Sequence, residues 1–375
     1  MNPGRMNYDC LKLVRVIGSD IYQLKFVKQL LKLTLIAYLI LLLLQLYYFF
    51  QTPNVEDLIK YGPLFLQMCS AVFTFAILLV KNRMVDDAMS TIELWDISSA
   101  GNDVKLRILR ESRQINAFVV VNTTLLMLWS TSYILSCNKD PQVIFIQIIF
   151  DKLCPWEANY ICVFIFKTTM YLEGLAMVAH TYQVIYVTQQ VKFQMYLCNA
   201  FIEGLNIHFQ ELEDPIRNNI YQKEIESKLK MIIDRHCIFL RWKNNTLMLM
   251  SNLIIPFTIC AIIVGISIVL LFLQEVLSWR DYLLAVIALF TIPGLITAGQ
   301  RFQDESENMF FKFTATEWYT WNIRNRKNLV LILMNTAQPL RLKFSESFVI
   351  NFDLLVFICK ALYSVLSILV KVKYN

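Results

Sequence analysis

Long apolar stretches alternate with polar segments along the chain. A helix needs roughly 20 mainly apolar residues to cross a hydrocarbon core about 30 Å thick. The first stretch, LTLIAYLILLLLQLYYFF, carries no charge and ends in aromatic residues suited to a membrane interface. Stretches of this kind lie near residues 31–50, 63–80, 116–137, 160–186, 248–274, 282–299 and 350–370. The pattern predicts an all-α membrane protein with seven transmembrane helices.

The polar segments between these stretches are themselves helical in pattern. Apolar and charged residues recur at helical spacing within 191–246, as in EIESKLKMIIDRHCIFLRW. We expect such helices to continue the transmembrane helices beyond the bilayer and to pack there as a cytoplasmic helical anchor region. The expected organisation is a cytoplasmic N-terminal segment (1–30), helices one to four (31–190), a cytoplasmic helical segment (191–247), helices five and six (248–300), a cytoplasmic anchor (301–347) and a last helix (348–375).

The basic residues indicate the orientation of the chain. One set of alternate segments holds 27 Lys and Arg residues and the opposite set holds six, the richer set being 1–32, 81–114, 191–246 and 301–347. An excess of Lys and Arg beside membrane spans marks the cytoplasmic side. We therefore expect a cytoplasmic N-terminus and, because the number of spans is odd, an extracellular C-terminus.

Composition supports a membrane protein and argues against a nucleic-acid partner. The chain is 57% hydrophobic and 17% charged, whereas soluble domains carry about 25% charged residues. The formal net charge of +6 comes from basic residues that are spread between the spans and form no stripe. We expect membrane lipid around the chain and no nucleic acid.

The sequence offers little material for catalysis or metal binding. Its nine cysteines contain no CxxC pair. Three of them surround one predicted external loop, where a disulfide is an open option: Cys137, Cys154 and Cys162. The three histidines form no pair at ligand spacing and are better explained as structural or interfacial residues, namely His180, His208 and His236. We predict neither an enzyme nor a metal or cofactor site.

Several classes of membrane protein can also be set aside. There is no TVGYG filter loop and no ladder of arginines, which argues against a voltage-gated potassium channel. No glycine loop that could cradle phosphate occurs, which argues against an ATP-driven pump. A rhodopsin-type receptor would have its N-terminus outside, opposite to the orientation expected here. Matching broken helices, the sign of an inverted-repeat transporter, are not found in the two halves.

Four ionisable residues lie within or close to the predicted spans: Lys167, Glu173, Asp353 and Lys360. Such residues usually face a bundle interior or a wet cavity, because exposure to lipid is costly. Asp353 and Lys360 are two helical turns apart and share one face. That face is either a structural pair near the cytoplasmic end of the last helix or the lining of a water-filled path.

The last helix, FDLLVFICKALYSVLSILVKVK, carries a second stripe at its external end. Ile368, Lys371 and Val372 are spaced i, i+3 and i+4 and therefore lie on one face. Ordinary helix packing, with a lysine that reaches the interface, would explain this stripe. The functional alternative is an apolar constriction that gates by dewetting, with the lysine at its mouth.

The outer halves of the second, third and fourth predicted helices supply soft, aromatic and small polar side chains. Such a mixture suits a closed pocket for a small apolar molecule with one or two polar anchors, although plain helix packing would use the same residues. The candidate ligand-binding residues are Phe65, Met68, Phe73, Met127, Ser130, Tyr133, Tyr160, Phe164 and Lys167.

Taken with this topology, three segments resemble the insect odorant receptors. Segment 233–260, IDRHCIFLRWKNNTLMLMSNLIIPFTIC, looks like the family's cytoplasmic helix running into its fifth span. Segment 317–343, EWYTWNIRNRKNLVLILMNTAQPLRLK, is similar to its Trp-containing stretch followed by a short helix and Gln-Pro. The last helix, with Lys360, Tyr363 and Ser364, looks like the family's C-terminal signature.

The resemblance implies a ligand-gated, nonselective cation channel of the plasma membrane of olfactory neurons, with no G protein required. Family members assemble as tetramers in which a tuning subunit works with a shared co-receptor. The last helix lines the pore, cytoplasmic helices join the subunits, and a volatile ligand, here expected to be aromatic or heterocyclic, binds in the outer half of one subunit. The co-receptor carries a long cytoplasmic insertion that this chain lacks, which implies a tuning subunit.

By the same resemblance, Ile368 and Val372 fall on gate positions and Lys371 on a polar pore position. Many family members have no lysine there, so the ion preference of this subunit stays open. The alternatives are a gustatory-receptor-type channel and a small-molecule transporter. Gustatory receptors end in a Thr-Tyr, five apolar residues, Gln-Phe pattern, and here no Gln-Phe follows Leu362 and Tyr363.

Overall fold

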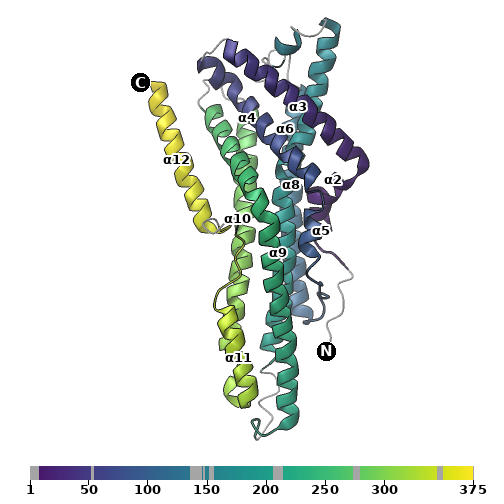
Figure 1. Ribbon diagram of the computed structural model, residues 1–375, viewed down its shortest axis with the longest axis vertical. Helices are drawn as coiled ribbons and strands as arrows, with labels where there is room; N and C mark the ends of the chain where they lie inside the picture. The colour runs from purple at the N-terminus through teal and green to yellow at the C-terminus, as the bar shows by residue number, and fades with distance from the viewer. Residues whose placement is uncertain are drawn as a thin grey trace.

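The chain forms a bundle of long helices in the computed structural model, which describes residues 8–51, 55–135, 146, 148–151, 156–205, 214–272, 279–343 and 349–374. Its long helices are α3 (Lys25–Gln51), α4 (Val55–Val80), α6 (Asn102–Leu135), α8 (Trp156–Glu203), α9 (Asn219–Phe272), α10 (Trp279–Thr314) and α12 (Phe352–Tyr374). Figure 1 shows most of them running along the longest axis of the molecule. The shorter elements are α1 (Lys12–Arg15), the π-helix η1 (Val16–Asp20), α2 (Ile21–Gln23), α5 (Met84–Met89), η2 (Trp318–Thr320) and α11 (Ile323–Thr336).

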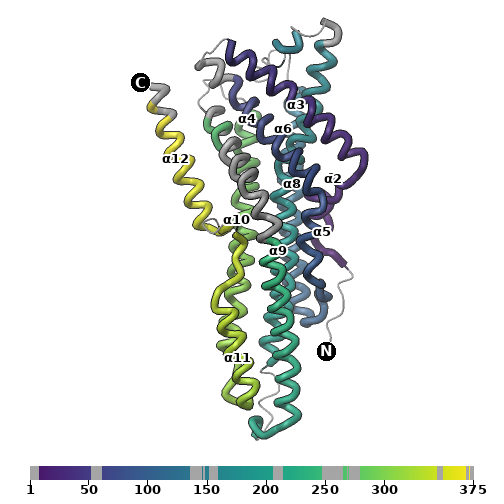
Figure 2. Tube along the Cα trace, viewed as in Figure 1, coloured from purple at the N-terminus to yellow at the C-terminus, as the bar shows by residue number. Residues whose placement is uncertain are grey.

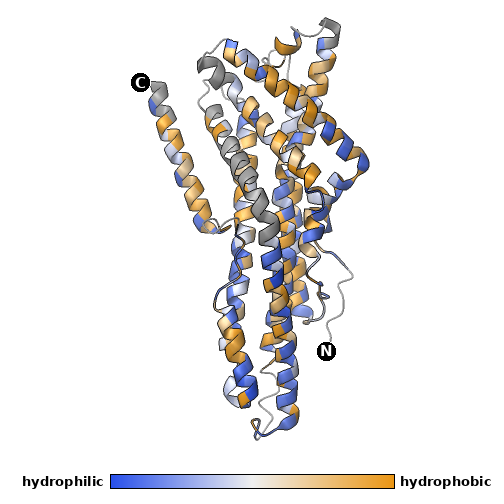
Figure 3. Ribbon diagram, viewed as in Figure 1, coloured by the Kyte–Doolittle hydropathy of each residue, from blue (hydrophilic) through white to orange (hydrophobic). Residues whose placement is uncertain are grey.

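Several helices are much longer than a bilayer is thick. Helix α8 has 48 residues and α9 has 54, which at 1.5 Å per residue corresponds to about 72 Å and about 81 Å. A hydrocarbon core of about 30 Å can therefore enclose only part of either helix. Figure 3 shows hydrophobic residues gathered in the upper half of the bundle, whereas hydrophilic residues are more frequent in the lower half.

Each predicted span coincides wholly or for most of its length with one of the long helices. Judged on the described residues, five candidate spans are long and apolar enough to cross a membrane: Lys25–Gln51, Tyr61–Val80, Asn102–Leu135, Asn159–Glu203 and Trp279–Thr314. The predicted spans 248–274 and 350–370 lie in α9 and α12, in part outside the residues whose side chains are described. The prediction of an all-helical fold with several apolar helices is confirmed, while the number of spans and the orientation of the termini stay predictions.

Helix α8 is the centre of the bundle. It packs most extensively against α10 and α6, and also contacts α4, α5, α9 and the N-terminal segment. Residues 182–199 are buried on every face of the helix as a result. Polar side chains in this stretch bond to neighbouring elements: Gln189 donates to the Ala298 carbonyl at 3.1 Å, and Gln194 donates to the Trp95 carbonyl at 3.2 Å.

The N-terminal segment is tied to α8 by close packing and long-range hydrogen bonds. A Cβ on Gly18 would lie 2.9 Å from the Cβ of Tyr182, so only glycine allows this approach. The Gln183 amide donates to the Gly18 carbonyl at 2.8 Å. The Asp9 carboxylate accepts hydrogen bonds from Tyr186 and Gln190.

Helix α12 stands apart from the other helices. It contacts α10 and α9, and most of its described side chains are exposed. Figure 2 shows the trace passing beside α10 after α11 and then diverging from the bundle as α12. The turn before α12 is held where the Ile350 amide donates to the Leu342 carbonyl at 2.9 Å.

Candidate functional site

A buried aromatic layer joins α3, α4 and α8 in the apolar half of the bundle. The ring of Tyr38 in α3 lies 5.8 Å from Phe75 in α4 and 5.9 Å from Phe166 in α8, measured between centroids. Met68 lies two helical turns before Phe75 on the same face of α4 and is fully buried. Its sulfur lies 3.8 Å from the amide nitrogen of Gln45. Soft and aromatic side chains from three helices thus meet in one place, as an apolar binding region requires.

Helix α6 packs against α8 next to this region. The rings of Trp129 and Tyr133 pack edge to face at 5.1 Å, and both side chains are buried. The Ser130 hydroxyl donates to the Met170 carbonyl of α8 at 3.1 Å. Gly174 lets the helices approach, because a Cβ there would lie 3.3 Å from the Ser130 oxygen.

Polar groups within this apolar region are concentrated on Glu173. Its side chain is fully buried, and one carboxyl oxygen lies 2.9 Å from the Tyr38 hydroxyl. The same hydroxyl lies 2.8 Å from Thr169, whose own hydroxyl donates to the Phe166 carbonyl at 2.6 Å. The sequence marked Glu173 as an ionisable residue within a predicted span but did not place it among the candidate ligand-binding residues.

The predicted ligand-binding residues fall into three groups by burial. Met68, Ser130, Tyr133 and Lys167 are buried, and Phe65 and Met127 are half-buried. Met68, Ser130 and Tyr133 lie near the aromatic layer around Tyr38. The remaining candidates are exposed on the single chain: Phe73, Tyr160 and Phe164.

Tyr38, Phe75 and Thr169 belong to the same region but were missed by the sequence analysis. Their burial was not visible there, because each lies in an apolar span among similar residues. The only available signal was that tyrosine and threonine hydroxyls usually find a partner when they are buried.

The candidate gate residues lie at the free end of α12. Ile368 is 63% exposed, Lys371 is exposed, and the side chain of Val372 lies outside the described residues. Asp353 accepts a hydrogen bond from Asn351 at 3.1 Å, and no ion pair with Lys360 occurs within the described part of α12. Asp353 and Lys360 are thus not paired with each other among the residues that the structure describes.

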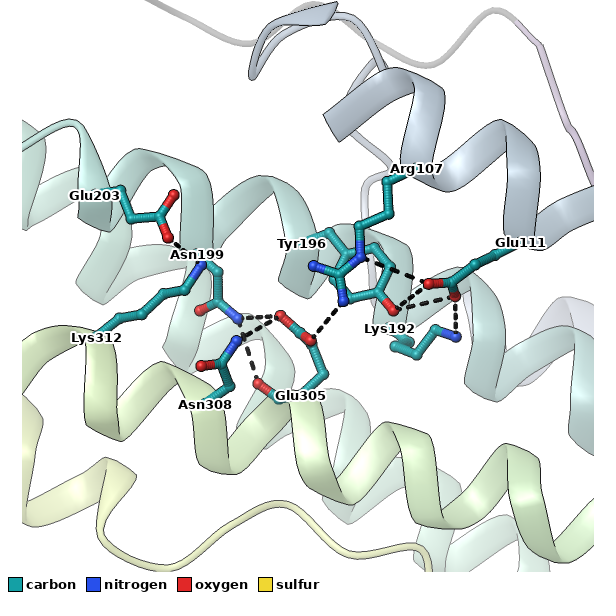
Figure 4. A network of polar contacts seen from close by, with 9 residues as sticks. All are labelled: Arg107, Glu111, Lys192, Tyr196, Asn199, Glu203, Glu305, Asn308 and Lys312. Atoms are coloured by element: carbon teal, nitrogen blue, oxygen red, sulfur yellow. Dashed lines mark hydrogen bonds and ion pairs between the residues drawn. The ribbon is translucent and has the colours of Figure 1, made fainter. Parts of the chain in front are cut away.

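Below the apolar half, a network of charged residues ties α6, α8 and α10 together (Figure 4). The Glu111 carboxylate lies 2.6 Å from the Lys192 ammonium and 2.8 Å from the Tyr196 hydroxyl. Arg107 lies 3.6 Å from both Glu111 and Glu305, and its guanidinium stacks over the Tyr196 ring at 3.9 Å. Movement of any one of these helices would disturb contacts with the other two.

A second buried cation fixes the segment that connects α5 to α6. Arg235 of α9 is 1% exposed and donates to the Glu93 carbonyl at 2.7 Å, while its guanidinium stacks over the Trp95 ring at 4.3 Å. Burial lowers the pKa of Arg235 to about 10, which leaves it charged at neutral pH.

Helix α11 presents apolar side chains to solvent. Ile323, Leu331 and Met334 are 72%, 59% and 71% exposed, and their spacing places them along one side of the helix. On the opposite side, Leu329 and Ile332 are buried against the bundle. An exposed apolar stripe of this kind usually marks a contact with another protein.

Comparison with known proteins agrees with this architecture. The family model described as 7tm Odorant receptor matches residues 54–363. The structure of the insect olfactory receptor OR5 from Machilis hrabei is similar, with a TM-score of 0.69, 10% sequence identity and 97% of each chain covered. A second structure of that receptor, in complex with eugenol, matches with the same values. No curated protein matches the chain by sequence. Because the family model covers most of its length, the chain belongs to the odorant receptor family.

Proposed function

We propose that this chain is the tuning subunit of an odorant-gated, nonselective cation channel in the plasma membrane of olfactory neurons. The observation that carries the proposal is its membership of the odorant receptor family over residues 54–363. In this role the chain crosses the membrane seven times, with its N-terminus in the cytoplasm and its C-terminus outside.

The ligand region is the aromatic layer between α3, α4, α6 and α8. Its buried members Met68, Ser130 and Tyr133 combine soft, polar and aromatic contacts, which suits a small volatile with one or two polar anchors. The related Machilis receptor was solved with eugenol, a small aromatic volatile. We therefore expect an aromatic or heterocyclic odorant. Phe65 and Met127 at the edge of this region, and Lys167 beside it, are the next candidates for ligand contact.

The pore is lined by α12. Its exposed polar face and its position beside the bundle support this role, because a charged residue within a span needs water or a partner. Ile368 and Val372 form the constriction, and Lys371 lies at its mouth. The ligand can open this gate only by its difference in affinity between the closed and open states.

The partner is a shared co-receptor, assembled with this chain into a heteromeric tetramer. The cytoplasmic helices supply the contact, and the exposed stripe Ile323, Leu331 and Met334 on α11 is the surface that supports it.

The test is whole-cell current in cells that express this chain with an odorant-receptor co-receptor, and each chain alone, against a panel of volatiles. We expect rapid odorant-evoked cation current that requires both chains and has a ligand profile absent from the co-receptor alone. Surface-expressed chains that give no current with a broad panel would instead favour a gustatory or transport role. Saturable uptake without single-channel steps would identify a transporter.

Orientation is tested separately. Glycosylation acceptor sites inserted at each terminus should be modified at the C-terminus and not at the N-terminus. The reverse pattern would contradict the proposed topology.

A further inference from the structure

The hydrogen bonds around Glu173 form a directed chain. Three bonds link the Glu173 carboxyl to Tyr38, Tyr38 to Thr169, and Thr169 to the Phe166 carbonyl, at 2.9, 2.8 and 2.6 Å. Each bond needs one proton. The Thr169 hydroxyl donates its proton to the Phe166 carbonyl, so Thr169 can only accept from the Tyr38 hydroxyl.

With an ionised carboxylate, the Tyr38 hydroxyl donates to Oε2 of Glu173, and its contact with Thr169 then has no proton. A neutral Glu173, protonated on Oε2, donates to Tyr38 and completes all three bonds at once. An ionised carboxylate would leave one of them unmade. The surroundings favour the neutral form too, because among the described residues no Lys or Arg forms an ion pair with Glu173, and an uncompensated buried charge is costly.

This arrangement leaves one oxygen of Glu173 available. Oε1 is buried and has no hydrogen-bond partner among the residues that the structure describes. With the proton on Oε2, this oxygen is a carbonyl-type acceptor. Gln45, two turns along the same face of α3 as Tyr38, also has a buried side-chain oxygen without a partner in the described chain. Unsatisfied buried acceptors cost free energy and are rare in native proteins.

We propose that the free oxygen of Glu173 accepts a hydrogen bond from the ligand, so that this receptor selects alcohols and phenols over ethers of the same shape. The inference rests on the proposed function and deepens it by naming the ligand class. The apolar body of the ligand packs against Phe75, Phe166 and Met68, while its hydroxyl group reaches Glu173. An ether of equal size fills the same space but leaves the oxygen unsatisfied.

The experiment compares matched ligand pairs on cells that express the full chain with a co-receptor. The probes are benzyl alcohol with benzyl methyl ether, and para-cresol with its methyl ether. One neutral hydrogen bond corresponds to about a tenfold difference in the concentration for half-maximal current. We expect the wild type to favour the hydroxyl member of each pair by about this factor.

Three variants test the residue. Glu173→Met keeps the volume but removes the acceptor, so the preference should fall to about onefold, with the ether response retained. Glu173→Gln keeps a carbonyl oxygen and should keep the preference. Glu307→Leu, at an exposed position on α10, is the matched control and should behave as the wild type.

Tyr38→Phe is a second route to the same question if Glu173→Met does not reach the cell surface. The variant keeps the Glu173 carboxyl group but removes the Tyr38 hydroxyl that accepts its proton. The proton can then move to Oε1, which no longer accepts a hydrogen bond from the ligand, so the preference for hydroxyl ligands should shrink. If these hydrogen bonds had only a structural role, the variants would weaken the current evoked by the alcohol and by the ether of each pair equally. Equal responses in the wild type, or a preference that survives Glu173→Met, would overturn the inference while leaving the channel function standing. No current with any volatile would instead overturn the proposed function, and the inference with it.

Discussion

The ammonium nitrogen of Lys192 in α8 lies 2.6 Å from the Glu111 carboxylate in α6, and the lysine side chain is completely buried. Two charges withdrawn from water in this way depend on each other, because the loss of one removes the nearest opposite charge of the other. The pair lies below the predicted spans, in the network that also joins α10 through Arg107 and Glu305. The network therefore holds α6, α8 and α10 together next to their predicted membrane spans.

Lys192→Met should destabilise the protein strongly. Removal of one partner of a buried ion pair typically costs about 3–5 kcal/mol, because Glu111 would lose its nearest cation and keep only the more distant Arg107 at 3.6 Å. The measurement is the thermal unfolding temperature of purified receptor. The double variant Lys192→Met with Glu111→Leu should recover part of the loss, since it removes both charges.

The control is the partly exposed pair formed by Lys228 and Glu224 at 2.8 Å. Exposed pairs contribute about 0–1 kcal/mol, so Lys228→Met should change the unfolding temperature little. Equal effects of Lys192→Met and Lys228→Met would contradict the view that the buried pair holds α6 to α8.

The α11 stripe predicts how the subunits are joined. Met334→Glu and Leu331→Glu place a charge on exposed apolar positions, so the single chain should fold normally while assembly with the co-receptor is lost. Co-purification of the co-receptor measures this. Leu106→Glu on α6, where the wild-type side chain is also exposed, is the matched control and should leave assembly intact. Undiminished co-purification with both α11 variants would remove this surface from the interface.

Buried His236 of α9 predicts sensitivity to acid. Burial lowers its pKa below the ordinary value of 6.5, so the histidine stays neutral in the folded protein and binds a proton more readily when unfolded. The contribution of His236 to the free energy of unfolding should therefore be constant above pH 6.5 and fall as the pH drops below it. Unfolding temperatures measured across this range should decline less steeply for His236→Gln than for the wild type. Identical slopes would show that His236 does not contribute.

The helices could be predicted from sequence because length and hydrophobicity are decisive for crossing a bilayer. The expected span 31–50 lies within α3, and the expected span 160–186 lies within the much longer α8. The N-terminal segment could not be predicted in this way. Its short helices are held by Asp9 and Gly18 against distant residues of α8, and such long-range contacts leave no periodic pattern.

The proposed ligand region shows the same limit at the level of single residues. Ser130 and Tyr133, named from the sequence as candidate ligand-binding residues, are both buried in α6. Glu173 was singled out for its charge, but nothing in either helix indicates that it meets Tyr38, more than 100 residues earlier in the chain. Spacing defines the faces of one helix, whereas the pairing of faces depends on how the whole bundle packs.

Lys371 predicts the ion preference of the pore. If α12 lines the path, its exposed ammonium group lies at the outer mouth and repels entering cations. Two unit charges 4 Å apart in bulk water interact by about 1 kcal/mol, and a divalent ion doubles this term. Calcium should therefore be excluded severalfold more than sodium. Replacing external sodium by calcium should shift the reversal potential of the odorant-evoked current to more positive values in Lys371→Gln than in the wild type.

The effect should depend on charge and on position along the chain. Lys371→Arg keeps the charge and should behave as the wild type, whereas Lys230→Gln, which removes an exposed lysine from the N-terminal half of α9, should change nothing. High external salt should narrow the difference, because screening shortens the reach of an exposed charge to about 3 Å at 1 M ionic strength. An unchanged reversal potential in Lys371→Gln would mean that this lysine faces away from the ions, and the gate would then have to be built from another face of α12.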